Sequence, residues 1–132
     1  MTGTGSVRLD MVTLLVPDYD SGIAFYCDGL GFDLIEDRKM SDTKRWVIIG
    51  SAHGMRLLIA KATTHAQQSA IGNLAGDRVG FFLHTDNFSA SAARCTAAGA
   101  EFESEPRTEE YGTVAVFRDP FGNRWDLIES VS

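Results

Sequence analysis

The sequence has few of the features that would place this protein in a membrane or in an oxidising compartment. Its 132 residues include three prolines and only two cysteines, Cys27 and Cys95. Two cysteines cannot provide the disulfide framework of a small secreted domain. No apolar run approaches the roughly 18 residues that a membrane helix needs, and the first residues lack the hydrophobic stretch of a signal peptide. We therefore expect a cytoplasmic protein that has no membrane partner.

Positive charge is also scarce. The chain has 12 lysines and arginines against 18 aspartates and glutamates, which gives a formal net charge of −6. An acidic protein repels polyanions, so nucleic acid is not expected as a partner. The histidines and cysteines show no His-x-His or Cys-x-x-Cys spacing that would indicate a local metal site. The length predicts a single domain that spans residues 1–132.

The sequence does contain an internal repeat with an offset of 68 residues. The offset carries landmarks of the first half onto similar residues of the second: Gly31 onto Gly99, Asp18 onto Asp86, Ser21 onto Ser89, and Cys27 onto Cys95. The repeat divides the chain into module 1 at about 7–61, a polar linker at 62–77 with room for one helical turn, and module 2 at about 78–130.

Each module shows the same order of predicted elements. A helix is predicted around the apolar stripe Ile23, Tyr26, Cys27 and Leu30 in module 1, and around Phe88–Cys95 in module 2. The predicted strands are Met11–Val16, Phe32–Glu36, Trp46–Gly50 and Met55–Ala60 in module 1, and Val79–Leu83, Ala100–Glu103, Thr113–Arg118 and Arg124–Glu129 in module 2. Each module is therefore predicted to be β-α-β-β-β. The expected core includes Phe81, Phe82, Phe117 and Trp125.

This order of elements, together with two motifs, resembles the vicinal oxygen chelate superfamily of glyoxalase I, bleomycin-resistance proteins and extradiol dioxygenases. The motifs are Val16-Pro17-Asp18, followed by Phe25-Tyr26 and Leu30-Gly31-Phe32, and the closing turn Asp119-Pro120-Phe121-Gly122-Asn123. The resemblance covers nearly the whole chain. It implies an α+β fold in which two tandem β-α-β-β-β modules form an incomplete barrel around a ligand cavity. It also implies a homodimer.

The resemblance further implies where a divalent metal would bind, because members usually hold it with the first and last strand of each module. The corresponding positions here are Met11 and Leu58 in module 1, and Val79 or Gly80 together with Asp126 in module 2. A thioether is a poor ligand for such a metal, aliphatic side chains offer none, and one carboxylate cannot hold it alone. We therefore expect no metal cofactor, and only His84 and Asp126 are candidate donors for an altered site.

Asp126 lies between two large apolar residues of a predicted strand, and the resemblance places it toward the cavity. A carboxylate in apolar surroundings needs a partner or a raised pKa. Two structural interpretations stay open, a pair with Arg124 and a pair with Thr13. The functional interpretation is that Asp126 anchors a ligand or acts as a general base.

Strand alternation adds further candidates. Trp46, next to Lys44 and Arg45, suits a planar or anionic ligand. His84 faces the cavity if Gly80 does, and it faces away if Val79 is the inward residue. Tyr111 precedes the seventh strand and resembles the lip of a pocket.

Two classes of function remain. The first is a metal-free protein that sequesters a drug or metabolite in clefts of a dimer, like the bleomycin-resistance branch. The second is a glyoxalase- or dioxygenase-like enzyme with an altered metal set, or a metal-independent lyase or isomerase that uses Asp126 as its base. The missing metal ligands favour the first. The predicted ligand-binding residues are Met11, Thr13, Trp46, Leu58, His84, Tyr111, Arg124 and Asp126.

Overall fold

The structure is a computed structural model that describes residues 3–51 and 53–131. Module 1 contains β1 (Met11–Val16), helix α1 (Tyr19–Ile23), its π-helical continuation η1 (Ala24–Gly29), β2 (Asp33–Lys39), β3 (Arg45–Gly50) and β4 (Arg56–Lys61). The linker carries helix α2 (His65–Ala70). Module 2 contains β5 (Phe81–His84), helix α3 (Phe88–Ala97), β6 (Glu101–Phe102), β7 (Arg107–Glu109), β8 (Gly112–Arg118) and β9 (Arg124–Ser130).

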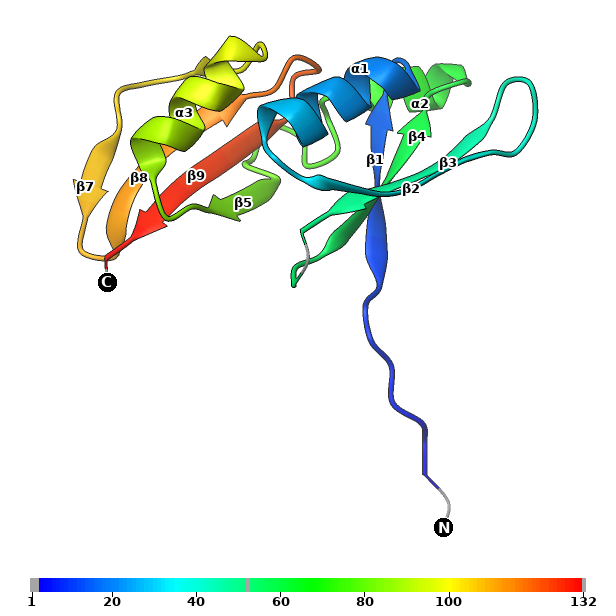
Figure 1. Cartoon of the computed structure of the whole chain (residues 1–132), viewed down its shortest axis with the longest axis horizontal. Helices are drawn as coiled ribbons and strands as arrows, with labels where there is room; N and C mark the ends of the chain where they lie inside the picture. Colours follow the sequence, from blue (N-terminus) through cyan, green and yellow to red (C-terminus); the bar gives the residue numbers. More distant parts are fainter. Residues whose placement is uncertain (1–2, 52, 132) are drawn as a thin grey trace.

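The described strands form two separate sheets rather than one closed barrel (Figure 1). Sheet A has the order β1-β4-β3-β2, and sheet B has the order β5-β9-β8-β6 with β7 paired to β8. In each sheet the first strand runs parallel to the last, and the other pairs are antiparallel. The α+β fold of two β-α-β-β-β modules is therefore confirmed. No helix of the described residues is both long and apolar enough to cross a membrane.

The helices of the two modules differ by one residue, and the π-helical segment absorbs the difference. Asp18 caps α1 by accepting from the Ser21 backbone N–H, and Asn87 caps α3 in the same way. Glycines with positive φ follow both helices, at Gly31 and Gly99. Gly31 lies 13 positions after Asp18, whereas Gly99 lies 12 positions after Asn87. A π turn accommodates such an extra residue within a helix. The constant offset of 68 was therefore wrong before the helices, where Asn87 rather than Asp86 matches Asp18.

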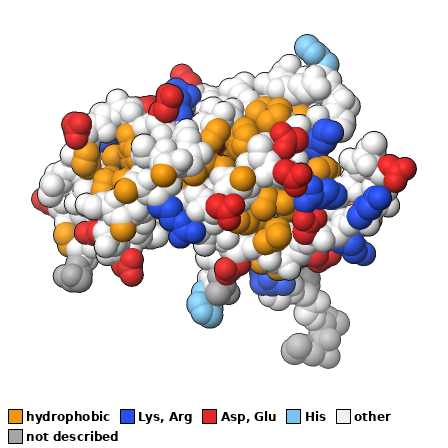
Figure 2. Space-filling model, turned by 45° about the horizontal axis from the view of Figure 1, so that its top comes forward, with side chains coloured by type: hydrophobic (Ala, Val, Ile, Leu, Met, Phe, Trp, Pro, Cys, Tyr) orange, Lys and Arg blue, Asp and Glu red, His pale blue; other side chains and the backbone are white. Residues whose placement is uncertain are grey.

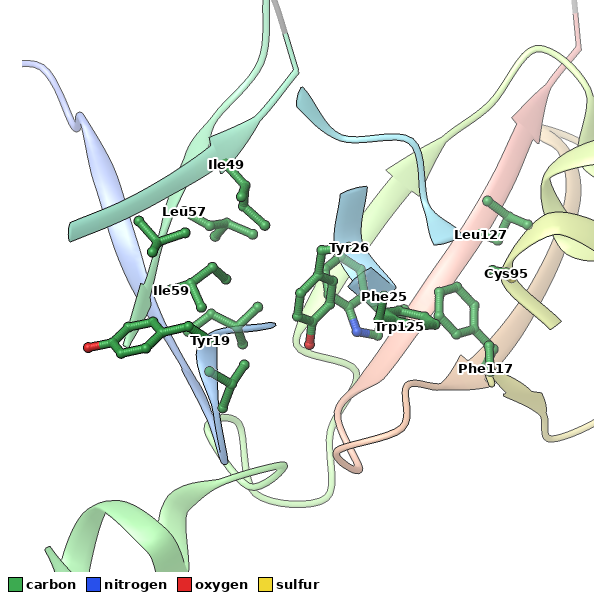
Figure 3. Close-up of a cluster of buried hydrophobic side chains, with 14 of the residues drawn as sticks. Tyr19, Phe25, Tyr26, Ile49, Leu57, Ile59, Cys95, Phe117, Trp125 and Leu127 are labelled. Atoms are coloured by element: carbon green, nitrogen blue, oxygen red, sulfur yellow. The ribbon is translucent and has the colours of Figure 1, made fainter. Parts of the chain in front are cut away.

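One hydrophobic core joins the two modules. Figure 3 shows Phe25 and Tyr26 of η1 between the apolar side chains of sheet A and those of sheet B. Trp125 is the centre of the sheet B side, where it stacks on Phe81 at a centroid distance of 4.3 Å. Helix α3 contacts η1 of module 1 and β9 of module 2, so helix packing joins the modules.

Several sequence predictions need correction. Strand β5 begins at Phe81 rather than Val79, and β7 was not predicted. Phe82 does not belong to the core, because its side chain points away from the helices and is 63% exposed. Phe117 and Trp125 are buried as expected, and Phe81 packs against the core. The helical turn expected in the linker is α2, which the capping box of Thr64 and Gln67 starts.

Candidate functional site

Each sheet has an inward face that packs on the helices and an outward face on the opposite side. In sheet A, Leu14 and Ile59 are buried inward residues, whereas Thr13 and Leu58 lie on the outward face. In sheet B, Trp125 and Leu127 point inward, and the alternation places Phe82, His84 and Asp126 on the outward face. The outward faces are where the sequence predicted the ligand-binding residues.

The strand register decides which residue is the counterpart of Met11. Met11 pairs with Arg56, and the Gly80 N–H donates to the Arg124 carbonyl at 3.0 Å, so Gly80 rather than Val79 matches Met11. One pair further along, Thr13 lies beside Leu58. The equivalent pair in module 2 is Phe82 and Asp126. The register thus places His84 on the same face as Gly80.

A pocket of about 480 Å³ lies on the outward face of sheet A, and we refer to it as the module 1 pocket. It brings together three predicted residues, Thr13, Trp46 and Leu58. The side chain of Trp46 is half-buried there, at the start of β3. Lys44 and Arg45, which the sequence placed beside Trp46, line it too. Residues that sequence reasoning did not select complete the lining: Leu15, Tyr19, Thr43, Ile59, Ala60, Lys61, Thr63 and Gln67.

Two sequence signals could have identified part of that missed lining. Leu15 has the same strand parity as Thr13, and Ala60 has the same parity as Leu58. The sequence Thr64-x-x-Gln67 is a capping box, which predicts a helix that starts directly after β4. Gln67 holds this helix start by accepting from the Thr63 backbone N–H at 2.8 Å. Helix α2 therefore forms a wall of the module 1 pocket.

Asp126 lies on the outward face of sheet B, between Phe82 of β5 and Val116 of β8. Its Oδ1 atom is buried and has no hydrogen-bond partner among the described residues. Neither structural pair considered for it is formed. Arg124 instead donates to both carboxylate oxygens of Glu103, at 2.8 Å each. Thr13 belongs to the other sheet.

The ion pair between Arg124 and Glu103 explains why Asp126 is left alone. Arg124 also donates to the Asp77 carbonyl at 2.7 Å, so its guanidinium is held away from the middle of the face. The hydrogen bonds from Arg124 lower the pKa of Glu103, and Glu103 in turn raises the pKa of Arg124. Arg124 was predicted to touch a ligand, but it fastens β9 to the loop after β6.

The other predicted residues are spread over the molecule. His84 stands at the end of β5, where its Nδ1 atom lies 3.2 Å from the Ser130 hydroxyl. Tyr111 is 52% exposed in the turn between β7 and β8. Met11 is half-buried at the start of β1, beside Arg56. The predicted set thus divides into a group on sheet A and a group on sheet B.

Comparison with known proteins identifies the family. Residues 8–127 match the Glyoxalase/Bleomycin resistance protein/Dioxygenase superfamily. The chain belongs to this superfamily. An uncharacterised protein of Shewanella frigidimarina is 45% identical over 121 residues, which are 89% of this chain and 90% of that protein. The crystal structure of UcmS2 is 30% identical and has a TM-score of 0.75, with 94% of this chain and 98% of that one covered.

A third similar structure is that of TnmS3, an antibiotic-binding protein from Streptomyces sp. CB03234. It has a TM-score of 0.72 at 23% identity, with 98% of this chain and 100% of that chain covered. At this identity the likeness shows the fold. Both solved structures match over nearly their whole lengths, so the arrangement of two modules is shared throughout.

The superfamily's metal positions do not fit a metal in this chain. With the register known, they are Met11, Leu58, Gly80 and Asp126. These four residues provide one carboxylate and one thioether, which is too few donors to hold a divalent metal. Among residues 3–51 and 53–131, no three His, Cys, Asp or Glu side chains lie close enough to share a metal ion.

A second, larger cleft of about 710 Å³ is lined by residues of both modules. Its lining is mostly apolar and includes Val12, Met55, Phe81, Phe82 and Trp125. His84 lies at this cleft as well. Val12, Met55 and Phe82 are exposed, with Phe82 the most open of the three. The edge strands β1 and β5, whose outer sides pair with no described strand, border the cleft.

Proposed function

We propose that this protein binds and sequesters a small organic molecule in the module 1 pocket. The observation that carries the proposal is the lining of that pocket, in which Trp46 and Leu58 form an apolar surface and Thr13 and Gln67 provide polar groups. A few polar groups around an apolar surface are typical of small-molecule sites, and 480 Å³ is within their usual range of volumes. The binding of an antibiotic by TnmS3, which has the same fold, supports this function.

We propose that binding needs no metal ion. The support is chemical, since the positions used for metal in the superfamily hold Met11, Leu58, Gly80 and Asp126. Elemental analysis of the purified protein should find well under one transition metal per chain. A stoichiometric metal with His84 and Asp126 as its ligands would refute this part of the proposal.

We also propose that the protein is a homodimer. The apolar cleft of about 710 Å³ and the free edges of β1 and β5 leave a large apolar area uncovered in a single chain. A second copy of the chain would bury this apolar area, because in a twofold dimer the same surface of each chain contacts the other. Light scattering should give twice the chain mass of 14.4 kDa. A mass of 14.4 kDa at micromolar concentration would contradict the dimer.

A dimer would also give Asp126 a role in binding. The groups on sheets A and B lie on separate faces of one chain, so the outward face of module 2 is free to cover the module 1 pocket of a second chain. The carboxylate of Asp126, which is only half-buried, would then accept a hydrogen bond from a hydroxyl or amine of the ligand. Loss of that charge-assisted bond weakens binding by about 1–3 kcal/mol.

Native mass spectrometry of the purified protein tests the binding function directly. Wild-type protein should retain a small molecule, and Trp46→Ala should lose it because the apolar surface is removed. Asp126→Asn should retain it more weakly. Leu9→Ala is the control, since Leu9 is 74% exposed before β1 and lines neither the module 1 pocket nor the larger cleft. Retention by Trp46→Ala equal to that of wild type would refute the assignment of the pocket.

The half-buried carboxylate of Asp126, which pairs with neither Arg124 nor Thr13, also favours one enzymatic candidate. In a metal-independent isomerase or lyase, this carboxylate would remove a proton from a bound ligand. Incubation of the retained molecule with wild-type protein in D2O would then introduce deuterium, which mass spectrometry detects. Asp126→Asn should abolish that exchange. If wild-type protein introduces no deuterium, the isomerase or lyase candidate is rejected and only the binding function remains proposed.

A further inference from the structure

The acidic side chains near the module 1 pocket have hydrogen-bond or ion-pair partners, whereas two of the lysines have no ion-pair partner among the described residues. A polar pocket of about 580 Å³ adjoins it and shares Tyr19, Thr43, Lys44, Arg45 and Lys61 with it. The carboxylates around these two pockets all have partners. Asp18 accepts from the backbone N–H and the hydroxyl of Ser21, at 2.8 Å each.

Arg45 uses two of the remaining carboxylates. It donates to Asp37 at 2.6 Å and to Asp20 at 2.8 Å, and its guanidinium lies 5.2 Å from the ring centre of Tyr19. Lys39 pairs with Asp42 at 3.5 Å. The acidic side chains of this end of the molecule are therefore occupied by neighbours, although the chain as a whole has an excess of negative charge.

Lys44 and Lys61 are different. Both line the module 1 pocket and the adjoining polar pocket, and among the described residues neither has a carboxylate within 4 Å. Figure 2 shows Lys and Arg side chains gathered toward the end of the molecule where the β2–β3 hairpin lies. Two ammonium groups without a described carboxylate within 4 Å thus border a pocket whose surface is formed by Trp46 and Leu58, and the charge of Lys61 reaches Asp18 only at longer range.

We propose that the ligand of the module 1 pocket is a planar anion, such as an aromatic carboxylate, sulfonate or phosphate ester. This inference rests on the proposed function and adds the charge of the ligand. The ring packs on Trp46 and Leu58, and the anionic group lies between the ammonium groups of Lys44 and Lys61. Such charge-assisted hydrogen bonds are stronger than neutral ones, and the apolar surface beside them strengthens them further.

The two lysines disfavour a cation in the same pocket. A cationic ligand would meet two ammonium groups, while Asp20, Asp37 and Asp42 are each paired with an arginine or a lysine. The ring of Trp46 and the more distant charge of Asp18 would have to hold the cation against that repulsion. The chemical class proposed here is thus opposite in charge to a cationic drug.

The test compares two probes of nearly equal shape, 2-naphthoate and its neutral analogue 2-naphthamide. Two-dimensional NMR of 15N-labelled protein reports the site, because the chain has only two tryptophan indoles. The Trp125 indole is buried and donates to Asp119 at 3.0 Å, whereas the Trp46 indole lies at the pocket. Titration with 2-naphthoate should move the Trp46 resonance and leave that of Trp125 in place.

We expect 2-naphthoate to bind about tenfold more tightly than 2-naphthamide, the scale of one charge-assisted hydrogen bond. Lys44→Gln and Lys61→Gln should each weaken 2-naphthoate several-fold and leave 2-naphthamide unchanged. Lys39→Gln is the matched control on the same hairpin, since Lys39 already pairs with Asp42, and it should change neither affinity. Addition of 0.5 M NaCl should reduce the difference between the probes.

Equal or tighter binding of 2-naphthamide would overturn the inference and leave the binding function intact. The inference would also fall if neither probe moved the Trp46 resonance at millimolar concentration. The proposed function is decided separately, by the small molecule that the purified protein retains. The two failures are therefore distinguishable.

Discussion

Replacement of Asp119 by the nearly isosteric asparagine should lower the stability of this fold strongly. Its side chain is buried and accepts five hydrogen bonds without a cation nearby. Oδ1 accepts from the backbone N–H groups of Phe121 and Asn123, at 2.9 and 3.0 Å. Oδ2 accepts from the Tyr26 hydroxyl at 2.5 Å, the Trp125 indole at 3.0 Å and the Asn123 amide at 3.0 Å.

Asp119→Asn places an NH2 group where Oδ2 accepts these bonds. The hydroxyl of Tyr26 can turn and the amide of Asn123 can flip to accept from the new donor, but the indole of Trp125 can only donate. The Trp125 bond is lost, at about 1.5–3 kcal/mol, and the remaining bonds lose the charge of the carboxylate at a similar total cost. We therefore expect the free energy of unfolding to fall by about 3–6 kcal/mol, a large share of the 5–15 kcal/mol typical of a domain.

Urea denaturation followed by circular dichroism measures this loss. Tyr26→Phe is the graded companion variant, because it removes one bond to Asp119 and should cost about 1.5–3 kcal/mol. It keeps the experiment decisive if Asp119→Asn does not fold. A loss below about 1 kcal/mol for Asp119→Asn would show that the network adds little, and the reasoning would be refuted.

Four further predictions concern pH, a glycine, Asp126 and metal. Burial, followed by the charge of Asp119, holds the pKa of Tyr26 well above its usual range. Above about pH 10 the unfolded chain therefore loses a proton that the folded protein keeps, and stability falls as pH rises. Tyr26→Phe should flatten the slope of the unfolding free energy against pH. Gly31→Ala should lower the free energy of unfolding by about 1–2 kcal/mol because of its φ of +86°, and further because the new Cβ would lie 2.8 Å from the Arg94 guanidinium. Gly76→Ala, where φ is +67° and the new Cβ meets open space, is the control in chemical denaturation. Asp126→Asn should change the melting temperature little, because no ion pair of the described residues is broken; a large loss would mean that Asp126 is structural. Dialysis against EDTA should leave both melting temperature and ligand retention unchanged, and a drop in either would contradict metal independence.

Most of the fold was readable from the sequence because each element has a local signal. β1 was predicted from Met11 to Val16 and has those bounds in the structure. The repeat correctly indicated two modules, but it could not show that the extra residue of module 1 sits inside the helix. That residue is absorbed by the backbone of η1, and no side chain marks the place. The start of β5 was placed two residues too early, because the apolar run that predicted it begins at Val79 and the strand begins at Phe81.

The site was less predictable, because alternation along a strand shows on which face of the sheet a side chain lies but not which side chains it contacts. Thr13, Trp46 and Leu58 were correctly placed on one face, and the structure joins them in a pocket. The partner of Arg124 could not be found by parity, since Glu103 comes from the loop after β6 and competes successfully for the guanidinium. Lys61 was missed because the predicted strand ended at Ala60, one residue before β4 ends, and Gln67 was missed because it lies on α2, beyond the alternation that guided the choice.

The short contacts between η1 and module 2 have a consequence for how the chain folds. Tyr26 belongs to the first half of the sequence, yet its hydroxyl bonds to Asp119 of the second half. Arg94 of α3 donates to the Asp28 carbonyl at the end of η1 at 2.8 Å. Neither half therefore has a complete interior of its own. A fragment ending after β4 should stay largely unfolded, and adding the other half as a separate chain should restore structure by association. The intact protein should unfold in one cooperative transition, so that no partly folded species with a single intact sheet accumulates.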